Sequence, residues 1–367
     1  MTKYKFPWFK PSADKKIYIK EIKKLINKDK MTMGSSCLKL EKKLKDLLKV
    51  KHVILTTSGT SALMMATIAL NINQKSKVIC TNMTWIATIN PAKIMGSKII
   101  LVDTEKGSHH VSFNLLNKKI KKYKPDLVYL VHLNGEPTYN SEFEILKKKF
   151  KFSVIEDSAQ CFPVKIKKNS FCGTLHEIGC FSLAISKLVN MVYGGFCVTN
   201  SDKLAKKLIS IRNNGVNASP ENAKMELSSI NGLNFKPSNL HASVGLTNLS
   251  NLKHNISQVK LINSLYLNSF RNNKFIKVLN SKKQNSLPIY ILAIVKKRKK
   301  FIKFCKYNNI ELHYNLRTLS ETNLFDYKKN LNNSLDISKN VIRLPSGPGY
   351  KINEVKKIIN ILKKYKS

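Results

Sequence analysis

The feature that most constrains the fold is a regular alternation of short β-branched runs with longer helical patterns between residues 52 and 200. Such alternation is typical of a three-layer α/β/α sandwich around a mostly parallel sheet. It predicts a seven-stranded sheet, with strands at His52–Thr56, Lys77–Thr81, Lys98–Val102, Leu127–His132, Ser153–Glu156, Ile178–Leu183 and Gly195–Thr199. Because ligands bind outside the carboxyl ends of the strands in such sheets, functional residues are expected there.

The pattern changes after about residue 246. A long amphipathic stretch from Leu252 to Arg271 is followed by a strand–helix–strand pattern and a final helix at Asn353–Tyr365. This order predicts a small α+β domain. We therefore expect a large domain over residues 1–248, which includes an N-terminal helical segment, and a small C-terminal domain over residues 249–367.

Basic residues dominate the charge, because 65 lysines and arginines face 22 acidic residues and give a net charge of +43. They are spread over nearly every amphipathic segment, and no nucleic-acid-binding motif or block of like charge is visible. We therefore expect no nucleic-acid partner. The positive field is expected to favour the approach of an anionic substrate.

Neither a membrane span nor a metal centre is indicated. No apolar run reaches the roughly 18–20 residues that a span needs, and Met1–Lys10 contains no apolar signal-like region, so we expect a cytoplasmic location without membrane insertion. The seven cysteines are odd in number and form no C-x-x-C pair. They indicate buried, reduced thiols rather than a disulfide framework or a zinc ribbon.

The first predicted strand runs into Thr57-Ser58-Gly59-Thr60-Ser61, where a helix is expected to begin. Small hydroxylated residues and a glycine at a helix N-terminus suit an anion, because exposed N–H groups and the positive end of the helix dipole face it. Ordinary N-capping by Ser58 or Thr60 is the alternative explanation.

Two further strand ends carry an aromatic ring and a pair of acids. Trp85 follows the second strand, where its ring is able to lie flat on a planar cofactor or, alternatively, to pack in the core. The fifth strand ends in Glu156 and Asp157. A carboxylate there suits a protonated ring nitrogen, although Asp157 or Ser158 would also serve as a helix N-cap.

Lys187 differs from the other lysines, because it follows a strand in a segment of apolar and small residues. Burial there would disfavour the charged ammonium and favour the nucleophilic amine that a Schiff base requires. A surface lysine whose stem lies along the protein is the alternative. An anion site, an aromatic platform, a ring-nitrogen carboxylate and an imine-forming lysine together match pyridoxal phosphate (PLP).

With these motifs in place, the chain resembles the DegT/DnrJ/StrS family of PLP-dependent aminotransferases that act on nucleotide-linked keto-sugars. The matching segments occur in family order over roughly residues 5–350: Thr32–Gly34, Ser58–Leu63, Thr84–Thr88, Val131–Gly135, Ile155–Gln160, Gly179–Ser182, Lys187, Gly194–Asn200, Arg212–Gly215, Gly232–Phe235 and Ala242–Leu246.

The resemblance implies the fold of type I aminotransferases and a homodimer with active sites at the subunit interface. It implies catalytic roles for Lys187, which would bind the cofactor covalently and later carry a proton, and for Asp157, which would face the pyridine nitrogen. The other implied cofactor contacts are Gln160 at the 3-hydroxyl, Trp85 on the ring, Gly59, Thr60 and Ser182 at the phosphate, and Asn234 at the phosphate of the neighbouring subunit.

The implied reaction is transamination of a nucleotide-linked keto-sugar, with glutamate as the expected amino donor, for surface polysaccharide or related glycan synthesis. Lysine at residue 187 favours this reaction, because family dehydratases carry histidine there. A PLP-dependent sugar dehydratase and a non-catalytic regulatory relative remain alternatives.

Several residues depart from the family pattern. Leu188 stands where asparagine is common, Glu136 where glutamine is frequent, and Lys236-Pro237 where arginine with an apolar residue is commoner. Near the end, Gly347 in the segment that begins at Arg343 stands where histidine is usual. His313 and Tyr314 resemble a substrate-side segment, with a structural role as the alternative. These departures leave the predicted cofactor residues intact and bear on the substrate.

Overall fold

The computed structural model describes residues 4–12, 15–27, 31–219, 222–227, 230–281, 285–314, 317–323, 325 and 330–366. Its central sheet has seven strands in the order β1, β9, β8, β5, β4, β2, β3. They are β1 (His52–Thr56), β2 (Lys77–Thr81), β3 (Lys98–Val102), β4 (Leu127–Val131), β5 (Ser153–Asp157), β8 (Ile178–Ser182) and β9 (Gly195–Thr199). Neighbours run parallel except at β9, which is antiparallel to β1 and β8. The predicted seven-stranded, mostly parallel sheet is confirmed.

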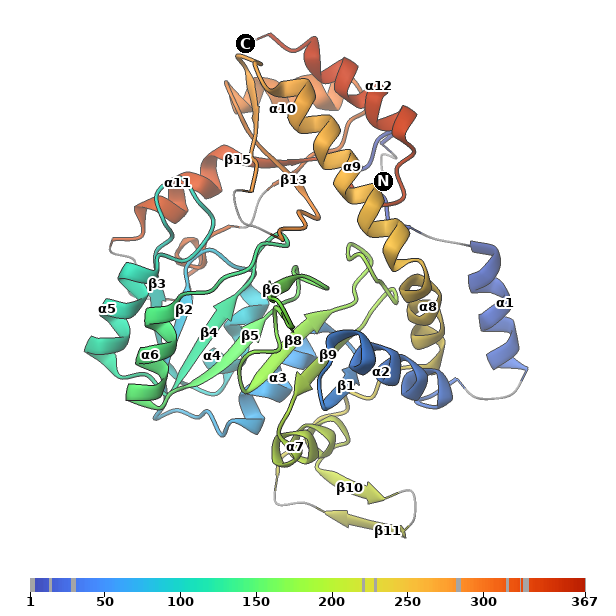
Figure 1. Ribbon diagram of the computed structural model, residues 1–367, viewed down its shortest axis with the longest axis vertical. Coiled ribbons are helices and arrows are strands. Elements are labelled where there is room, and N and C mark those ends of the chain that lie inside the picture. Colours follow the sequence, from blue (N-terminus) through green and yellow to red (C-terminus); the bar gives the residue numbers. More distant parts are fainter. Residues whose placement is uncertain are drawn as a thin grey trace.

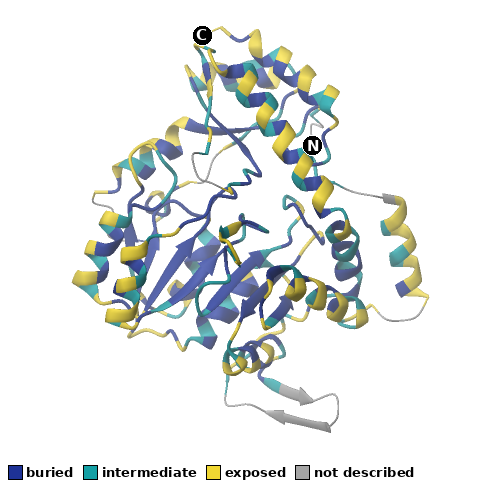
Figure 2. Ribbon diagram, in the orientation of Figure 1, coloured by how far each residue is buried: buried dark blue, intermediate teal, exposed yellow. Residues whose placement is uncertain are grey.

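Helices cover both faces of this sheet (Figure 1). One face packs against α3 (Gly59–Ala69), α4 (Asn90–Ile94) and α7 (Asp202–Arg212). The other packs against α5 (Phe113–Tyr123), α6 (Ser141–Phe150), α2 (Ser35–Leu48) and α8 (Asn239–Ser250). Because successive strand residues point to opposite faces, Ile54 joins the first core and Leu55 the second. Figure 2 shows strands buried on both faces, which explains their continuous apolar runs.

The connection between β2 and β3 contains two short helical segments rather than one continuous helix. The structure has a short 3-10 helix, η1 (Ile86–Thr88), followed by α4. Pro91 lies in the first turn of α4. Proline lacks the N–H that a continuous helix would need there and favours a helix start, so the break at this residue follows from its chemistry.

The C-terminal part builds a second, smaller layer of helices and strands. These are α9 (Leu252–Phe270), β12 (Ile276–Val278), β13 (Ile291–Val295), α10 (Arg298–Tyr307), β14 (His313–Tyr314), η2 (Leu319–Glu321), α11 (Asn332–Asn340), β15 (Val341–Leu344) and α12 (Ile352–Lys363). The strands pair in the order β12, β13, β15, β14. This arrangement matches the predicted α+β pattern.

Chain segments cross between the two parts. Near the N-terminus, Phe6 and Phe9 form β-bridges with Ile310 and Ser346 of the smaller part. In the opposite direction, Asn82 after β2 donates hydrogen bonds to Ser320 and Ser334. The division at residue 248 stays a prediction, and it falls in the last turn of α8.

Helix α1 (Lys15–Ile26) packs beside α8. Two two-stranded sheets complete the fold. One pairs β6 (Lys165–Lys167) with β7 (Ser170–Phe171), and the other pairs β10 (Val216–Ser219) with β11 (Asn222–Leu227). All seven cysteines are buried, and the described residues contain no disulfide. None of the helices in the described ranges combines the length and hydropathy that a membrane span requires.

Candidate active site

A cavity of about 410 Å³ lies at the carboxyl ends of the central strands, where the parallel topology predicts a ligand. Strands β1, β5 and β8 lead into its floor. The smaller part closes one side with Tyr290 beside β13, His313 and Tyr314 of β14, and Arg343 of β15. Of the predicted cofactor residues, it is lined by Gly59, Thr60, Trp85, Asp157, Gln160, Ser182 and Lys187.

The start of α3 forms one end of this cavity. Ser58 caps the helix, because its hydroxyl accepts a hydrogen bond of 3.0 Å from the N–H of Ser61. The N–H groups of the first helical turn have no acceptor within the helix, and Gly59 and Thr60 both line the cavity. A Cβ at Gly59 would lie 3.0 Å from Ser182 Cβ, so glycine permits this close approach. Ordinary capping by Ser58 is therefore confirmed, and the anion site at this helix start stays a prediction.

Asp157 ends β5 and is 5% exposed. Its carboxylate accepts hydrogen bonds from the Thr88 hydroxyl at 2.6 Å and from the N–H of Ala159 at 3.1 Å. It makes no ion pair with any residue that the structure describes. Burial raises the pKa of the Asp157 carboxyl, and the hydrogen bonds and the more distant Lys187 only partly offset this effect. A carboxylate in this state is suited to a cation that enters the cavity.

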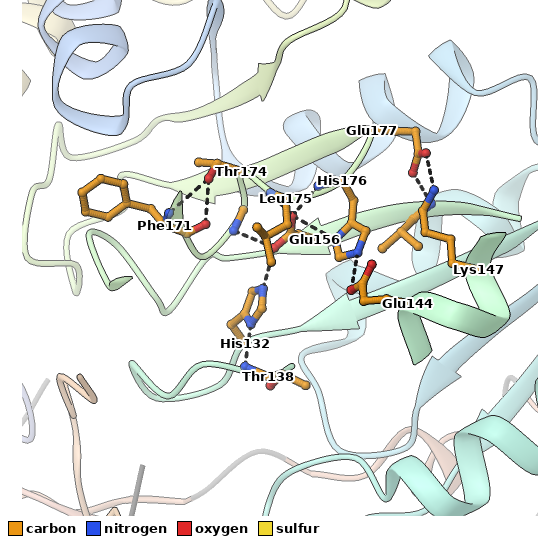
Figure 3. A network of polar contacts seen from close by, with 12 residues as sticks. His132, Thr138, Glu144, Lys147, Glu156, Phe171, Thr174, Leu175, His176 and Glu177 are labelled. Atoms are coloured by element: carbon orange, nitrogen blue, oxygen red, sulfur yellow. Dashed lines mark hydrogen bonds and ion pairs between the residues drawn. The ribbon is translucent and has the colours of Figure 1, made fainter. Parts of the chain in front are cut away.

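The neighbouring acid, Glu156, has a different role. It is fully buried and accepts hydrogen bonds from the N–H groups of Gly173, Leu175 and His176. His132 Nε2 donates to it at 2.9 Å, because His132 Nδ1 accepts from the N–H of Thr138 (Figure 3). Burial acts to raise the pKa of Glu156, but His132 and His176 hold it well below its usual range. Glu156 therefore anchors the loop after β7 and is not among the residues that line the cavity.

Lys187 lies in the loop between β8 and β9 and is half-buried. Two buried asparagines hold this loop, because Asn248 and Asn255 donate to the carbonyls of Asn190 and Leu188. The Nζ of Lys187 reaches the cavity and donates to the Tyr290 hydroxyl at 3.4 Å. The lysine is therefore no surface residue, and its amine shares one cavity with Asp157.

The remaining predicted contacts occupy different places. Trp85 lines the cavity with 60% of its surface exposed. Gln160 lines it too, and its side-chain oxygen accepts a hydrogen bond of 3.1 Å from the N–H of Asn134. Asn234 is exposed and lies outside the described lining of this cavity. Such a position leaves it available to a neighbouring subunit.

Sequence reasoning missed a cluster that shares the cavity with Lys187 and combines Tyr290 and Arg343 of the smaller part with Trp8 near the N-terminus. The guanidinium carbon of Arg343 lies 4.1 Å from the centroid of the Tyr290 ring and 5.9 Å from that of Trp8. Arg343 is 6% exposed, its Nε atom makes no hydrogen bond, and its guanidinium forms no ion pair with any described residue. Burial acts to raise the pKa of Tyr290, but Lys187 and Arg343 together lower it. Only Arg343 carried a signal in the sequence, as the start of a segment that departs from the family pattern.

The residues present fit PLP. A helix N-terminus with Ser182 suits its phosphate, the buried carboxylate of Asp157 suits a protonated pyridine nitrogen, and the Lys187 amine suits its aldehyde. These groups all line one cavity.

Comparison with known proteins gives the same family. A sequence profile described as the DegT/DnrJ/EryC1/StrS aminotransferase family matches residues 12–363. A GDP-perosamine synthase of Escherichia coli O157:H7 is 29% identical over 233 residues, which are 64% of this chain and 62% of that protein. A UDP-4-amino-4,6-dideoxy-N-acetyl-beta-L-altrosamine transaminase of Campylobacter jejuni is 27% identical over 75% of this chain and 73% of that protein.

Solved structures share the fold. Helicobacter pylori PseC, an aminotransferase involved in the biosynthesis of pseudoaminic acid, superposes with a TM-score of 0.88 at 20% identity, over 98% of both chains. The GDP-4-keto-6-deoxy-D-mannose-3-dehydratase of E. coli with bound hydrated PLP has a TM-score of 0.85 at 19% identity, over 98% of this chain and 99% of that one. Because this one fold supports two reactions, the reaction of this chain has to be inferred from its site residues.

Proposed function

The chain belongs to the DegT/DnrJ/EryC1/StrS aminotransferase family, and on that premise we propose that it transfers an amino group to a nucleotide-linked keto-sugar with PLP as cofactor. The observation that carries the proposal is the lysine amine of residue 187, which shares one cavity with the Asp157 carboxylate and the N-terminus of α3. The relatives in Escherichia coli and Campylobacter jejuni are named for GDP- and UDP-linked amino sugars.

Lys187 is the proposed proton carrier. When bound, PLP supplies an aldehyde that holds the amino group and a ring that takes up electron density from the carbon that loses its proton. The Lys187 amine takes a proton from the donor carbon and returns one at the end of the transfer, as general base and then acid. The Tyr290 hydroxyl accepts a hydrogen bond from Nζ and donates to the carbonyl of Ser186, so it orients the amine in the cavity.

Asp157 is the proposed partner of the cofactor ring nitrogen. A negative charge here keeps that nitrogen protonated. The hydrogen bonds from Thr88 and Ala159 fix the carboxylate plane. Gly59, Thr60 and Ser182 are the proposed phosphate contacts, Trp85 the ring platform and Gln160 the contact of the 3-hydroxyl.

Arg343 supports glutamate as the amino donor. A buried guanidinium without an acidic partner is unfavourable unless an anion joins it, and Arg343 lines the cavity on the side of Tyr290. Arginine binds carboxylates through two parallel hydrogen bonds. Lys187 and Arg343 approach the same Tyr290 ring, with Lys187 Nζ 5.9 Å from its centroid. An amino acid is therefore able to place its amine near Lys187 and its carboxylate on Arg343.

A homodimer is the proposed assembly. Trp85 and Tyr193 both line the cavity, yet they are 60% and 69% exposed in the single chain. Asn234 is exposed away from the cavity of its own chain. A second copy that covers these aromatic rings and contributes its Asn234 to the phosphate accounts for both observations.

The absence of disulfides among buried cysteines supports a reducing, cytoplasmic location.

The decisive experiment incubates the purified holoenzyme with glutamate and a panel of GDP- and UDP-linked keto-sugars, and detects the product by mass spectrometry. We expect an amino sugar and the loss of the visible absorption of the Lys187-bound cofactor when glutamate is added alone. A sugar that loses a hydroxyl group without gaining an amine would favour the dehydratase. Protein that stays colourless with added PLP would favour the regulatory relative.

The donor assignment has its own test, in Arg343→Met with Arg343→Lys as the conservative control. We expect Met to raise the KM for glutamate by roughly 10²-fold, in line with a lost charge-assisted pair, while conversion of the keto-sugar by the aminated enzyme stays close to wild type. Lysine should restore part of the loss. An effect confined to the sugar half of the reaction would contradict the assignment.

A further inference from the structure

Two histidines and a glutamate form a cluster beside the cofactor cavity, outside the predicted site residues. His109 and His110 come from the loop after β3, and Glu136 comes from the turn after β4. One nitrogen of each histidine and a carboxylate oxygen all lie within 4.8 Å of one another. The side chains of His109, His110 and Glu136 are 12%, 11% and 9% exposed, so the cluster is largely shielded from water.

The separations within this cluster suit ligands of one ion. His109 Nε2 lies 3.4 Å from Glu136 Oε1, and His110 Nε2 lies 2.7 Å from Glu136 Oε2. The Nε2 atom of His109 is buried and makes no hydrogen bond. Two atoms that each lie about 2.0–2.1 Å from a tetrahedral zinc ion are about 3.4 Å apart. The side chains therefore need only small shifts to share an ion.

The backbone presents these side chains from two fixed turns. In the β3 loop, the N–H of Glu105 donates to the carbonyl of His110 at 2.9 Å. In the β4 turn, the N–H of Glu136 donates to the carbonyl of Leu133 at 2.9 Å. The two residues between them, Asn134 and Gly135, both have positive φ, as a type I′ turn requires. Neither ligand segment depends on a long free loop.

The charge at residue 136 is unusual in two respects. The family resemblance leads one to expect glutamine there, which would be neutral. In a chain with 65 lysines and arginines, Glu136 pairs with the two histidines and with no described lysine or arginine. The carboxylate is thus matched to the pair of imidazoles rather than to a permanent cation.

We propose that His109, His110 and Glu136 bind a divalent transition-metal ion of the zinc class. Two imidazole nitrogens and a carboxylate oxygen are a known zinc donor set, in which water takes the fourth position. Imidazole ligands disfavour magnesium and calcium, which prefer oxygen. The proposal departs from the sequence expectation of no metal centre, which was drawn from the cysteines, because its ligands are histidines and a glutamate.

The ion joins the β3 loop to a turn that supports the cavity. Asn134 donates its N–H to Gln160 and its side-chain amide to the carbonyl of Tyr290, and its side-chain oxygen accepts from the N–H of Tyr290. His109 and Gln160 also line one small adjoining cavity. Binding of the ion therefore stiffens the wall that holds both Gln160 and Tyr290.

The test uses the holoenzyme after treatment with a chelator, titrated with zinc chloride and, separately, with cobalt chloride. We expect one equivalent of zinc per chain by elemental analysis, a higher midpoint of thermal unfolding, and the intense visible absorption of four-coordinate cobalt without a thiolate band. Glu136→Gln and His109→Asn should lose the ion. His52→Asn should keep it, because His52 pairs with Asp202 alone, at an exposed site.

The proposal is wrong if the wild-type protein takes up no zinc, or if Glu136→Gln and His109→Asn bind as much as His52→Asn. Should the two variants fail to fold, the cobalt spectrum of the wild-type protein decides. A thiolate band would exclude these three ligands, and the weak absorption of six-coordinate cobalt would exclude the proposed four-coordinate, zinc-type site. Neither readout depends on activity, so failure here leaves the proposed transamination untouched.

Discussion

His176 offers a quantitative test of the buried network behind the cofactor site. Its Nε2 lies 3.1 Å from Glu144 Oε1 and its Nδ1 lies 3.1 Å from Glu156 Oε1 (Figure 3). Only the doubly protonated imidazolium is able to offer a proton to both carboxylates. Burial acts to lower the pKa of His176, but Glu144 and Glu156 together raise it to about 9.

The sign of the pH dependence follows from this shift. The pKa of His176 is higher in the folded protein than in the unfolded chain, where histidine titrates near about 6.5. Its contribution is therefore complete below about pH 6.5 and is lost as the pH rises through about 9. At about 1.4 kcal/mol for each pKa unit, the contribution to the free energy of unfolding has an upper limit of about 3.5 kcal/mol.

The assay is urea unfolding of wild-type protein and His176→Asn at several values between about pH 6 and about pH 10. We expect the stability difference between them to shrink by about 2–3 kcal/mol over this range. His254→Asn, at an exposed histidine, serves as the control and should show no such change. A difference that stays constant with pH would show that His176 does not carry a second proton and would refute the reasoning.

Three further predictions concern the cavity and its supporting turn. Asp157→Asn should reduce transamination by on the order of 10²-fold or more, while thermal unfolding shows the cofactor-free protein at least as stable as wild type, because burial disfavours the carboxylate. Trp85→Ala should weaken cofactor binding in a spectroscopic titration with little change in the melting temperature of the cofactor-free chain, since the ring is 60% exposed. Gly135→Ala should destabilise the fold by about 2–4 kcal/mol, because its Cβ would lie 1.8 Å from the carbonyl oxygen of Leu287. Gly107→Ala, which has a similar positive φ but an open space, should lose only about 1 kcal/mol in the same unfolding assay.

The two acids at the end of β5 have different roles that the sequence alone did not predict. Both Glu156 and Asp157 follow a buried strand, and the pattern marks that strand end as a place for a carboxylate. The structure separates them, because Asp157 lines the cavity and Glu156 binds three backbone N–H groups of a loop about 17–20 residues further along. The partners of Glu156 are brought to it only by the folded sheet.

Local patterns predicted the α/β/α fold, the seven-stranded sheet and the cofactor class, the motif resemblance predicted the family, and all four are confirmed. Strand periodicity, helix starts and strand-end residues are set by neighbours along the chain, so the sequence carries them directly. The packing of distant segments decided the rest: Arg343 and Trp8 face Lys187, and His109 and His110 meet Glu136. These contacts join residues from separate strands and loops. They depend on how the folded layers pack together, so no local sequence pattern predicts them.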